Sequence, residues 1–254
     1  KSTGSLNLGF GYSTSAGPLM DVTLRERNLL GQGQSLSAAF TLAAEKSSIN
    51  LSFTEPFFMN REVSAGFDLF HTRRDFQDSR SFDSQNTGFG VRAGFPLSEA
   101  LRQTWEYGFD VAEVENISSA ASTLIKEQEG TRYASTVKHG LLYDLRDSKL
   151  FPTEGYVTRL SNALAGLGGN VFYLRNVVSG AQHYSPAKDW VLSVSTRAGH
   201  ILGLGEDVQI VDRFFLGGGT LRGFASAGVG PRDQRTKDSL GGEWIYNGTV
   251  ELRL

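Results

Sequence analysis

Apolar and polar residues alternate along most of this chain with a period of two. In residues 4–13, leucine, phenylalanine and tyrosine occupy every second position, and mainly glycine, serine and asparagine stand between them. Strict alternation over this length is typical of a β-strand with one apolar face. Thirteen such segments are predicted, at residues 4–13, 18–28, 34–44, 47–56, 61–73, 84–95, 101–115, 131–145, 155–166, 170–184, 188–202, 207–216 and 241–254.

The predicted strands are long, and nothing competes with them. Most have ten residues or more, whereas strands of soluble proteins usually have about five to six. Turn sequences such as Gly31-Gln32-Gly33 separate them, and no segment of useful length has the period of a helix. The chain shows no linker and no shift in composition, so residues 1–254 are predicted to form one all-β domain.

Two environments suit strands with one apolar face. A soluble sandwich buries the apolar face against a second sheet, whereas a membrane barrel turns it toward lipid and keeps the polar face inside. Three features favour the antiparallel transmembrane barrel. Strands of about 9–11 residues match a tilted crossing of the bilayer. Longer polar connectors at 75–83, 116–130 and 217–240 alternate with short ones. Aromatic residues such as Trp190 cluster near strand ends, as at membrane interfaces.

The composition excludes several classes of function. The chain has 30 glycines and 28 aromatic residues, which suits many strands joined by turns, and its formal charge of −2 gives no reason to expect a nucleic-acid partner. It has no cysteine, which excludes disulfides and thiolate metal sites. The four histidines are isolated, and no Gly-x-Ser-x-Gly or His-Glu-x-x-His motif occurs. We therefore expect no enzyme activity, no metal and no cofactor, and we interpret acids such as Asp207 and Asp212 as ordinary turn or rim charges.

The most unusual segment is a long connector, GGGTLRGFASAGVGPRD, at residues 217–233. Connectors of this length are uncommon in compact domains and are usually functional when they occur. Arg222 lies in its middle. If the connector folds into a barrel, the guanidinium of Arg222 leaves bulk water, and a buried cation requires a partner.

This segment carries a resemblance to a known family. Residues 216–224, LGGGTLRGF, contain the tetrad Leu221, Arg222, Gly223 and Phe224, and a Gly-Pro stretch follows at 228–231. Further similar pieces stand in the family's order at residues 1–13, 27–36, 51–58, 143–156 and 240–252. With these pieces the chain resembles the BamA branch of the outer-membrane assembly superfamily, to which the mitochondrial sorting-and-assembly barrel and the chloroplast import channel are related.

The resemblance implies a sixteen-strand barrel with the long connector folded into its lumen. About thirteen of those strands are predicted here, so the resemblance marks the chain as a C-terminally incomplete barrel domain without the family's N-terminal POTRA domains. It also implies a carboxylate partner for Arg222 on the strand after the connector, where Glu251 stands at the matching place. The alternation independently puts Glu251 on the inward face with Asn247 and Thr249.

The function that the resemblance implies is insertion of other β-barrel proteins into the outer membrane of a Gram-negative bacterium. Its lateral seam would lie at the first strand, formed by Gly4, Ser5, Leu6, Asn7, Leu8, Gly9, Phe10, Gly11 and Tyr12. The glycines weaken this strand, or they simply make room for the connector. The expected partners are the lipid bilayer, client barrel proteins and, mainly through the POTRA domains, assembly lipoproteins.

Other functions remain open on the sequence. A TamA-like or two-partner-secretion pore of the same superfamily would share the Arg-Gly-Phe connector. A passive porin, or a soluble β-sandwich that binds a partner, belongs to a different class. Neither of these last two needs a glycine-rich connector with a matched glutamate.

Overall fold

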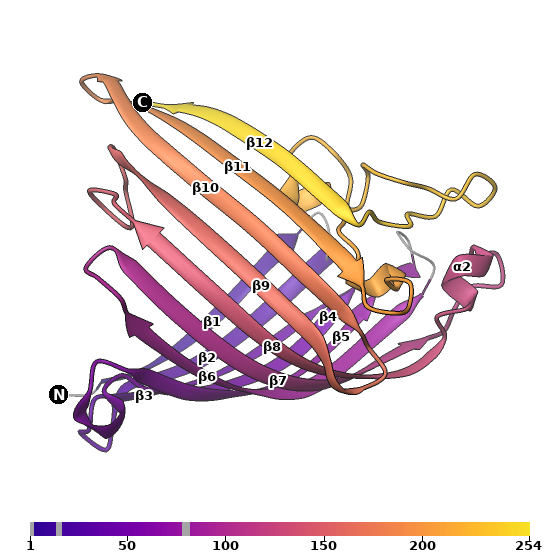
Figure 1. Cartoon of the computed structure of the whole chain (residues 1–254), viewed down its shortest axis with the longest axis horizontal. Helices are drawn as coiled ribbons and strands as arrows, with labels where there is room; N and C mark the ends of the chain where they lie inside the picture. Colours follow the sequence, from indigo (N-terminus) through magenta and orange to yellow (C-terminus); the bar gives the residue numbers. More distant parts are fainter. Residues whose placement is uncertain (1–2, 14–16, 78–81) are drawn as a thin grey trace.

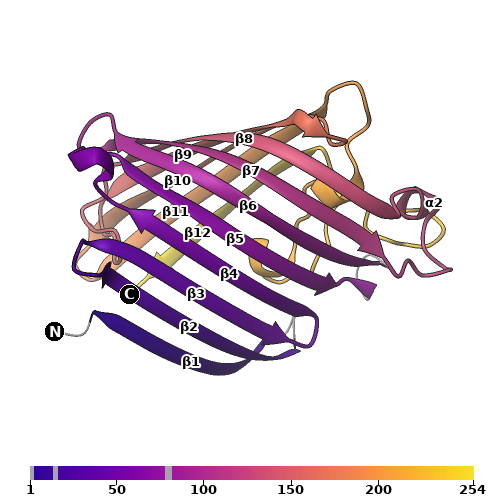
Figure 2. The same cartoon turned by 90° about the horizontal axis from the view of Figure 1, so that it is seen from below.

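The chain folds into a single curved antiparallel sheet (Figures 1 and 2). The computed structural model describes residues 3–13, 17–77 and 82–254. Within them the sheet has twelve strands in strict chain order, β1 to β12, each hydrogen-bonded to its neighbours in sequence. Such an up-and-down meander needs only hairpin connections, because antiparallel neighbours can follow one another directly.

The strands have the length that the alternation predicts. Their bounds are β1 Gly4–Ser13, β2 Gly17–Leu29, β3 Gln34–Ala43, β4 Lys46–Glu55, β5 Ser64–Asp75, β6 Asp83–Pro96, β7 Leu101–Glu115, β8 Gly130–Asp144, β9 Gly155–Gly169, β10 Tyr173–Ala187, β11 Trp190–Gly203 and β12 Trp244–Arg253. Within the described residues, four short helices lie between the strands. Those that matter here are α2, Thr123–Lys126, and the 3₁₀ turns η2, Ile210–Asp212, and η3, Gly218–Thr220.

The prediction of an all-β antiparallel sheet of long strands is confirmed, and the count of thirteen is wrong by one. Residues 207–216 form no strand. They hold η2 and two isolated bridges, Phe214 to Gly242 and Leu216 to Val229. The segment shows a strand-like pattern because Val208, Ile210 and Phe214 are buried in two apolar clusters, although their backbone forms no ladder. One-sided packing of an irregular segment therefore produced the same pattern as a strand.

The sheet curls strongly but stays open among the described residues. β1 pairs only with β2, and β12 pairs only with β11. Figure 2 shows the sheet as a trough with β1 at one rim, and Figure 1 shows β12 at the other. The two edge strands are therefore the places where this structure offers unpaired backbone groups.

The two faces of the sheet differ in chemistry. On the outward face, Leu8, Val22, Phe40 and Ile49 stand in one row across the first four strands, and leucine, valine and aromatic side chains on later strands remain exposed. The inward face carries glycine, serine, threonine and charged residues. Among the described residues no helix is long and apolar enough to cross a membrane.

The connector between β11 and β12, residues 204–243, folds back against the inward face. One apolar cluster joins Val208 and Phe214 of the connector to Ile201 and Ile245 of the wall. A second cluster joins Ile210 to Ala121 and Ile125 of the β7–β8 connector, to Val114 of β7 and to Phe82 just before β6. These clusters hold most of the buried apolar residues of the molecule, so the core lies where the connector meets the sheet.

Candidate functional site

The structure brings Arg222 and Glu251 together. Arg222 Nη1 donates to Glu251 Oε1 at 3.0 Å, from the connector to the inward face of β12. The pair is exposed, however: the Arg222 side chain is 89% accessible and that of Glu251 is 52% accessible. The expectation that the guanidinium leaves bulk water is therefore wrong for this structure. β12 is an edge strand here, and no described residue covers the pair on its open side.

The other residues of the tetrad have separate positions. Leu221 lines a cavity between the connector and the sheet, Gly223 has a φ of +86°, and the Phe224 side chain is 52% exposed. The backbone oxygen of Phe224 accepts a hydrogen bond from the N–H of Gly218 at 2.8 Å. The tetrad thus closes a loop on the η3 turn rather than filling a pocket with its aromatic side chain.

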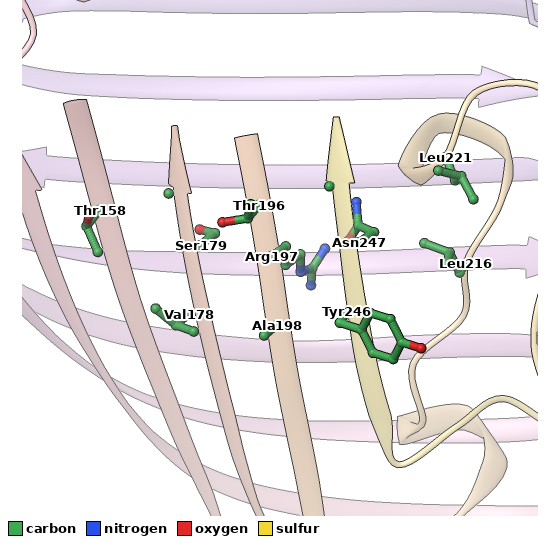
Figure 3. Close-up of a pocket in the computed structure, with 12 residues that line it drawn as sticks. Thr158, Val178, Ser179, Thr196, Arg197, Ala198, Leu216, Leu221, Tyr246 and Asn247 are labelled. Atoms are coloured by element: carbon green, nitrogen blue, oxygen red, sulfur yellow. The ribbon is translucent and has the colours of Figure 1, made fainter. Parts of the chain in front are cut away.

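The cavity beside Leu221 has a volume of about 700 Å³ and opens toward the wall formed by β9 to β12 (Figure 3). Leu216 and Leu221 of the connector lie on one side of it. Ser179, Arg197 and Asn247 are among the wall residues that line it. The connector therefore leaves unfilled space against the sheet.

A second ion pair anchors the connector, and the sequence analysis missed it. Arg132, at the start of β8, binds Asp212 in η2, and their side chains are only 8% and 20% exposed. Burial raises the pKa of Asp212, and the charge of Arg132 opposes that shift. Our interpretation of Asp212 as a rim charge is wrong. Because the two residues lie 80 positions apart, no local spacing could have revealed the pair.

An arginine–aromatic contact lies beside this ion pair. The guanidinium carbon of Arg175 lies 4.4 Å from the centroid of the Phe214 ring. A cation over an aromatic face is attracted by the ring's negative face. Arg175 on β10 therefore holds the connector just after η2.

The far part of the connector docks on the β7–β8 connector. The backbone N–H of Ser122 donates to Asp238 Oδ2, and Ser122 Oγ donates to Asp233 Oδ2, both at 2.8 Å. Backbone N–H groups of Thr236 and Arg235 also donate to Asp233. The hydrogen bonds from Thr236 and Ser122 lower the pKa of Asp233 to about 2.

The nine residues proposed for the seam all lie on β1. They pair with β2 in an unbroken register from Gly4 with Glu26 to Ser13 with Gly17. The other edge of β1 has no partner strand among the described residues. Its outward side chains, Leu6, Leu8, Phe10 and Tyr12, are between 61% and 77% exposed. The strand thus presents both unpaired backbone and bare apolar surface.

The comparisons with known proteins agree with this architecture. A family model described as the Omp85 superfamily domain matches residues 28–254. The chain belongs to the Omp85 superfamily. It is a β-barrel domain of the outer membrane of a Gram-negative bacterium, in agreement with its long strands and its apolar outward face.

Two curated bacterial relatives and one animal relative cover the whole domain. Outer membrane protein assembly factor BamA is 32% identical in Nitratidesulfovibrio vulgaris and 30% identical in Neorickettsia risticii, over 100% and 99% of this chain. The human sorting and assembly machinery component 50 homolog is 28% identical over 98% of it. The chain spans 34% of each of the two BamA proteins and 52% of the human one.

Two solved structures share the fold. Haemophilus ducreyi BamA lacking POTRA domains 1–3 superposes with a TM-score of 0.86 at 23% identity, over 99% of this chain and 53% of that one. CdiB from Acinetobacter baumannii gives a TM-score of 0.59 at 12% identity, over 99% and 46%. At these identities the likenesses show the fold alone.

Among the described residues, no three His, Asp or Glu side chains are grouped as a metal site would require.

Proposed function

We propose that this Omp85 domain is the membrane-embedded part of a factor that folds and inserts other β-barrel proteins into the outer membrane. Its curated relatives are named as assembly factors and as a component of a sorting and assembly machinery. The observation that carries the proposal is the edge of β1, which among the described residues has no partner strand and lies beside an exposed apolar face.

An edge of this kind can template a client strand. An extended segment adds to an open sheet edge through main-chain hydrogen bonds, so the edge accepts many sequences. In lipid an unpaired backbone group costs several kcal/mol, and therefore a client strand gains strongly by pairing there. No nucleotide hydrolysis is needed, because the client's own strand pairing and apolar burial supply the free energy.

The glycines of β1 suit a seam that exchanges partners. On its inward face a Cβ added at Gly9 would lie 3.7 Å from the Asp21 side chain of β2, and one added at Gly11 would lie 3.6 Å from that of Leu19. The two glycines leave these cross-strand contacts unmade, so the pairing of β1 is weak there. β1 can therefore hold a client strand and later release it.

The connector is proposed to act as a plug tied to the wall. Its buried contacts lie toward β8 and β10, whereas the exposed Arg222–Glu251 pair lies at the edge strand β12. The exposure of Arg222 would then change when another segment covers β12. The bilayer and client barrels are the proposed partners, and assembly lipoproteins would act mainly through parts outside this domain.

Capture of a client strand tests the proposal. Residues 1–254 contain no cysteine, so a single cysteine placed among them is the only thiol of this domain in the full-length protein. Asn7→Cys on β1 is matched by Ala39→Cys on β3, because Asn7, Thr23 and Ala39 stand in one cross-strand row of the inward face. During insertion of a client that carries cysteines in its terminal strand, we expect disulfide capture from Asn7→Cys and not from Ala39→Cys.

The same pair of variants separates the alternative function. A pore of the same superfamily passes its substrate through the lumen, where the inward position 39 is as close as position 7. Capture from Ala39→Cys alone, or equally from both positions, would therefore contradict the edge mechanism and favour translocation.

A further inference from the structure

The wall formed by β9 to β12 carries an excess of positive charge. These four strands contain four arginines, Arg159, Arg175, Arg197 and Arg253, and no lysine. Their one acidic residue is Glu251, and Arg222 of the connector already binds it. The strand registers place the four arginines on the inward face, together with Ile201 and Ile245 of the apolar cluster.

Three inward cations elsewhere in the sheet have acidic partners, whereas Arg25, Arg74 and Arg102 form no ion pair among the described residues. Arg92 binds Asp68, Lys138 binds Glu106, and Arg132 binds Asp212. Within residues 3–13, 17–77 and 82–254, neither Arg159 nor Arg197 forms an ion pair. Two neighbouring cations without counter-charges repel each other, weakly here because Arg159 is exposed and Arg197 is half-buried, and an anion between them removes that repulsion.

A cavity lies between these two arginines. Its volume is about 360 Å³, and the polar residues that line it are Arg146, Arg159, Ser179, Ser195, Thr196, Arg197 and Asn247. No acidic side chain lines it. Arg146 is already held by Asp144 through two hydrogen bonds of 2.9 and 2.8 Å, so Arg159 and Arg197 supply the uncompensated charge.

The registers place the two arginines on the strands that flank β10. Ser179 on β10 pairs with Arg159 on β9 and with Arg197 on β11, and Arg197 pairs with Asn247 on β12. Neighbouring strands are about 4.8 Å apart, so the two arginine backbones are separated by about 10 Å with Ser179 midway. In Figure 3, Arg197 extends from β11 toward Asn247. An anion above Ser179 would be within reach of a hydroxyl donor and of Arg159, and of Arg197 once its side chain turns from Asn247 toward β10.

We propose that this cavity binds a phosphate group, bridged by Arg159 and Arg197 and oriented by Ser179 and Asn247. Guanidinium groups bind phosphate through two parallel hydrogen bonds, and the tetrahedral group has enough oxygens for both forks and the serine hydroxyl. A phosphate monoester carries about −1.5 to −2 charges near neutral pH, which matches two arginines, whereas one carboxylate would neutralise half of them. The phosphate can come from a free anion or from a lipid whose headgroup is a phosphate monoester.

Calorimetric titration of inorganic phosphate into the full-length protein in a maltoside detergent tests the site. The variant Arg159→Gln/Arg197→Gln is expected to bind phosphate at least about tenfold more weakly, since charge-assisted hydrogen bonds are each worth about that factor or more. The matched control is Arg25→Gln, an arginine on the inward face of β2 in the opposite wall. It should bind like the wild type. Arg159→Lys/Arg197→Lys keeps the charge and loses the forks, and should bind with intermediate affinity.

Three results would overturn the proposal: no phosphate binding to the folded wild type, equal binding to the double variant, or an equal loss in Arg25→Gln. The thermal unfolding midpoint of each variant shows whether it is folded. If the double variant does not fold, the two single variants Arg159→Gln and Arg197→Gln are titrated instead. Repeating the titration in nanodiscs with phosphatidic acid, whose headgroup is a phosphate monoester, identifies the source. A headgroup in the site weakens the apparent affinity for free phosphate, and a free anion is unaffected by the lipid.

Discussion

Two arginine–carboxylate pairs join the connector to the sheet, and they differ in their contact with water. Arg222 and Glu251 are exposed, so solvent screens their attraction and the pair contributes little to stability. Arg132 and Asp212 are mostly buried, so the loss of one partner leaves the other as an uncompensated charge. The residues of the sequence motif are thus not the residues that hold the connector most strongly.

Removing one member of each pair separates the two roles. Arg132→Ala should destabilise the docked connector by about 3–5 kcal/mol, because Asp212 remains buried without its partner. Glu251→Gln should cost less than about 1 kcal/mol, because both groups of its pair are exposed. Hydrogen exchange at the amides of residues 208–214, or proteolysis within the connector, measures the effect. Equal effects of the two substitutions would show that burial does not decide the strength of these pairs.

The docking of the connector on Ser122 should weaken in acid. The pKa of Asp233 lies at about 2 in the folded protein, below its ordinary value of 3.8. A carboxylate whose pKa is lower in the folded state stabilises the fold at every pH above its pKa in the unfolded state. This stabilisation is lost as the pH falls from 3.8 through about 2. Proteolysis of residues 231–239 by pepsin across this range should rise in the wild type. Asp233→Asn should remove this pH step, and its persistence would assign the step to other groups.

At the scale of elements, the connector is an ordered structure built on backbone geometry. Gly217 has a φ of +129° and a ψ of 177°, a combination that residues other than glycine rarely adopt. Its N–H donates to Thr220 Oγ1 at 3.0 Å, and so the run of three glycines starts a closed η3 turn. The length of the connector therefore does not make it a flexible loop.

Two glycines of the same run should respond differently to alanine. A Cβ at Gly217 would overlap Ala225 O and lie 2.9 Å from Gly228 N, whereas a Cβ at Gly219 meets nothing within 4 Å. Gly217→Ala should cost at least about 1–3 kcal/mol of connector stability, and Gly219→Ala should be nearly neutral. Hydrogen exchange at Gly218 and Thr220 reads this out. A tolerated Gly217→Ala would mean that the turn can rearrange.

At the scale of the whole molecule, the sheet separates two environments. Its apolar residues point outward and its glycines, hydroxyls and charges point inward, the arrangement of an outer-membrane barrel. The usual core is reduced to two clusters under the connector. Stability therefore depends on lipid against the outward face.

Adjacent residues in the middle of β4 test this division. Leu51 stands on the outward face, in a row with Ala38 and Leu69, and Asn50 stands on the inward face. Leu51→Arg should cost about 2–4 kcal/mol near the bilayer midplane, whereas Asn50→Arg should cost much less. Reversible unfolding in lipid vesicles measures both. A larger loss of stability from Asn50→Arg than from Leu51→Arg would show that the outward and inward faces have been assigned the wrong way round.

Periodicity was sufficient for most of the fold, because each strand's pattern reports its own environment. The outcome for β1 illustrates this: residues 4–13 were predicted, and the strand is Gly4–Ser13. The same reasoning failed at residues 207–216. Val208 and Phe214 are buried against the sheet there, but the segment is not hydrogen-bonded as a strand. Periodicity detects a buried side, and it does not detect the ladder partners that make a strand.

The sequence by itself determined the long alternating strands, the two chemical faces and the motif around Arg222. These are local properties, set by the side-chain period of two and by a short run of residues. Only the tertiary structure decided which inward charges meet. It placed Arg132 against Asp212 across 80 residues, left Arg222 exposed at the edge strand, and set Arg159 and Arg197 around one cavity. Those outcomes depend on strand register and on the path of the connector, because a contact between distant residues is a property of the folded chain and not of either segment.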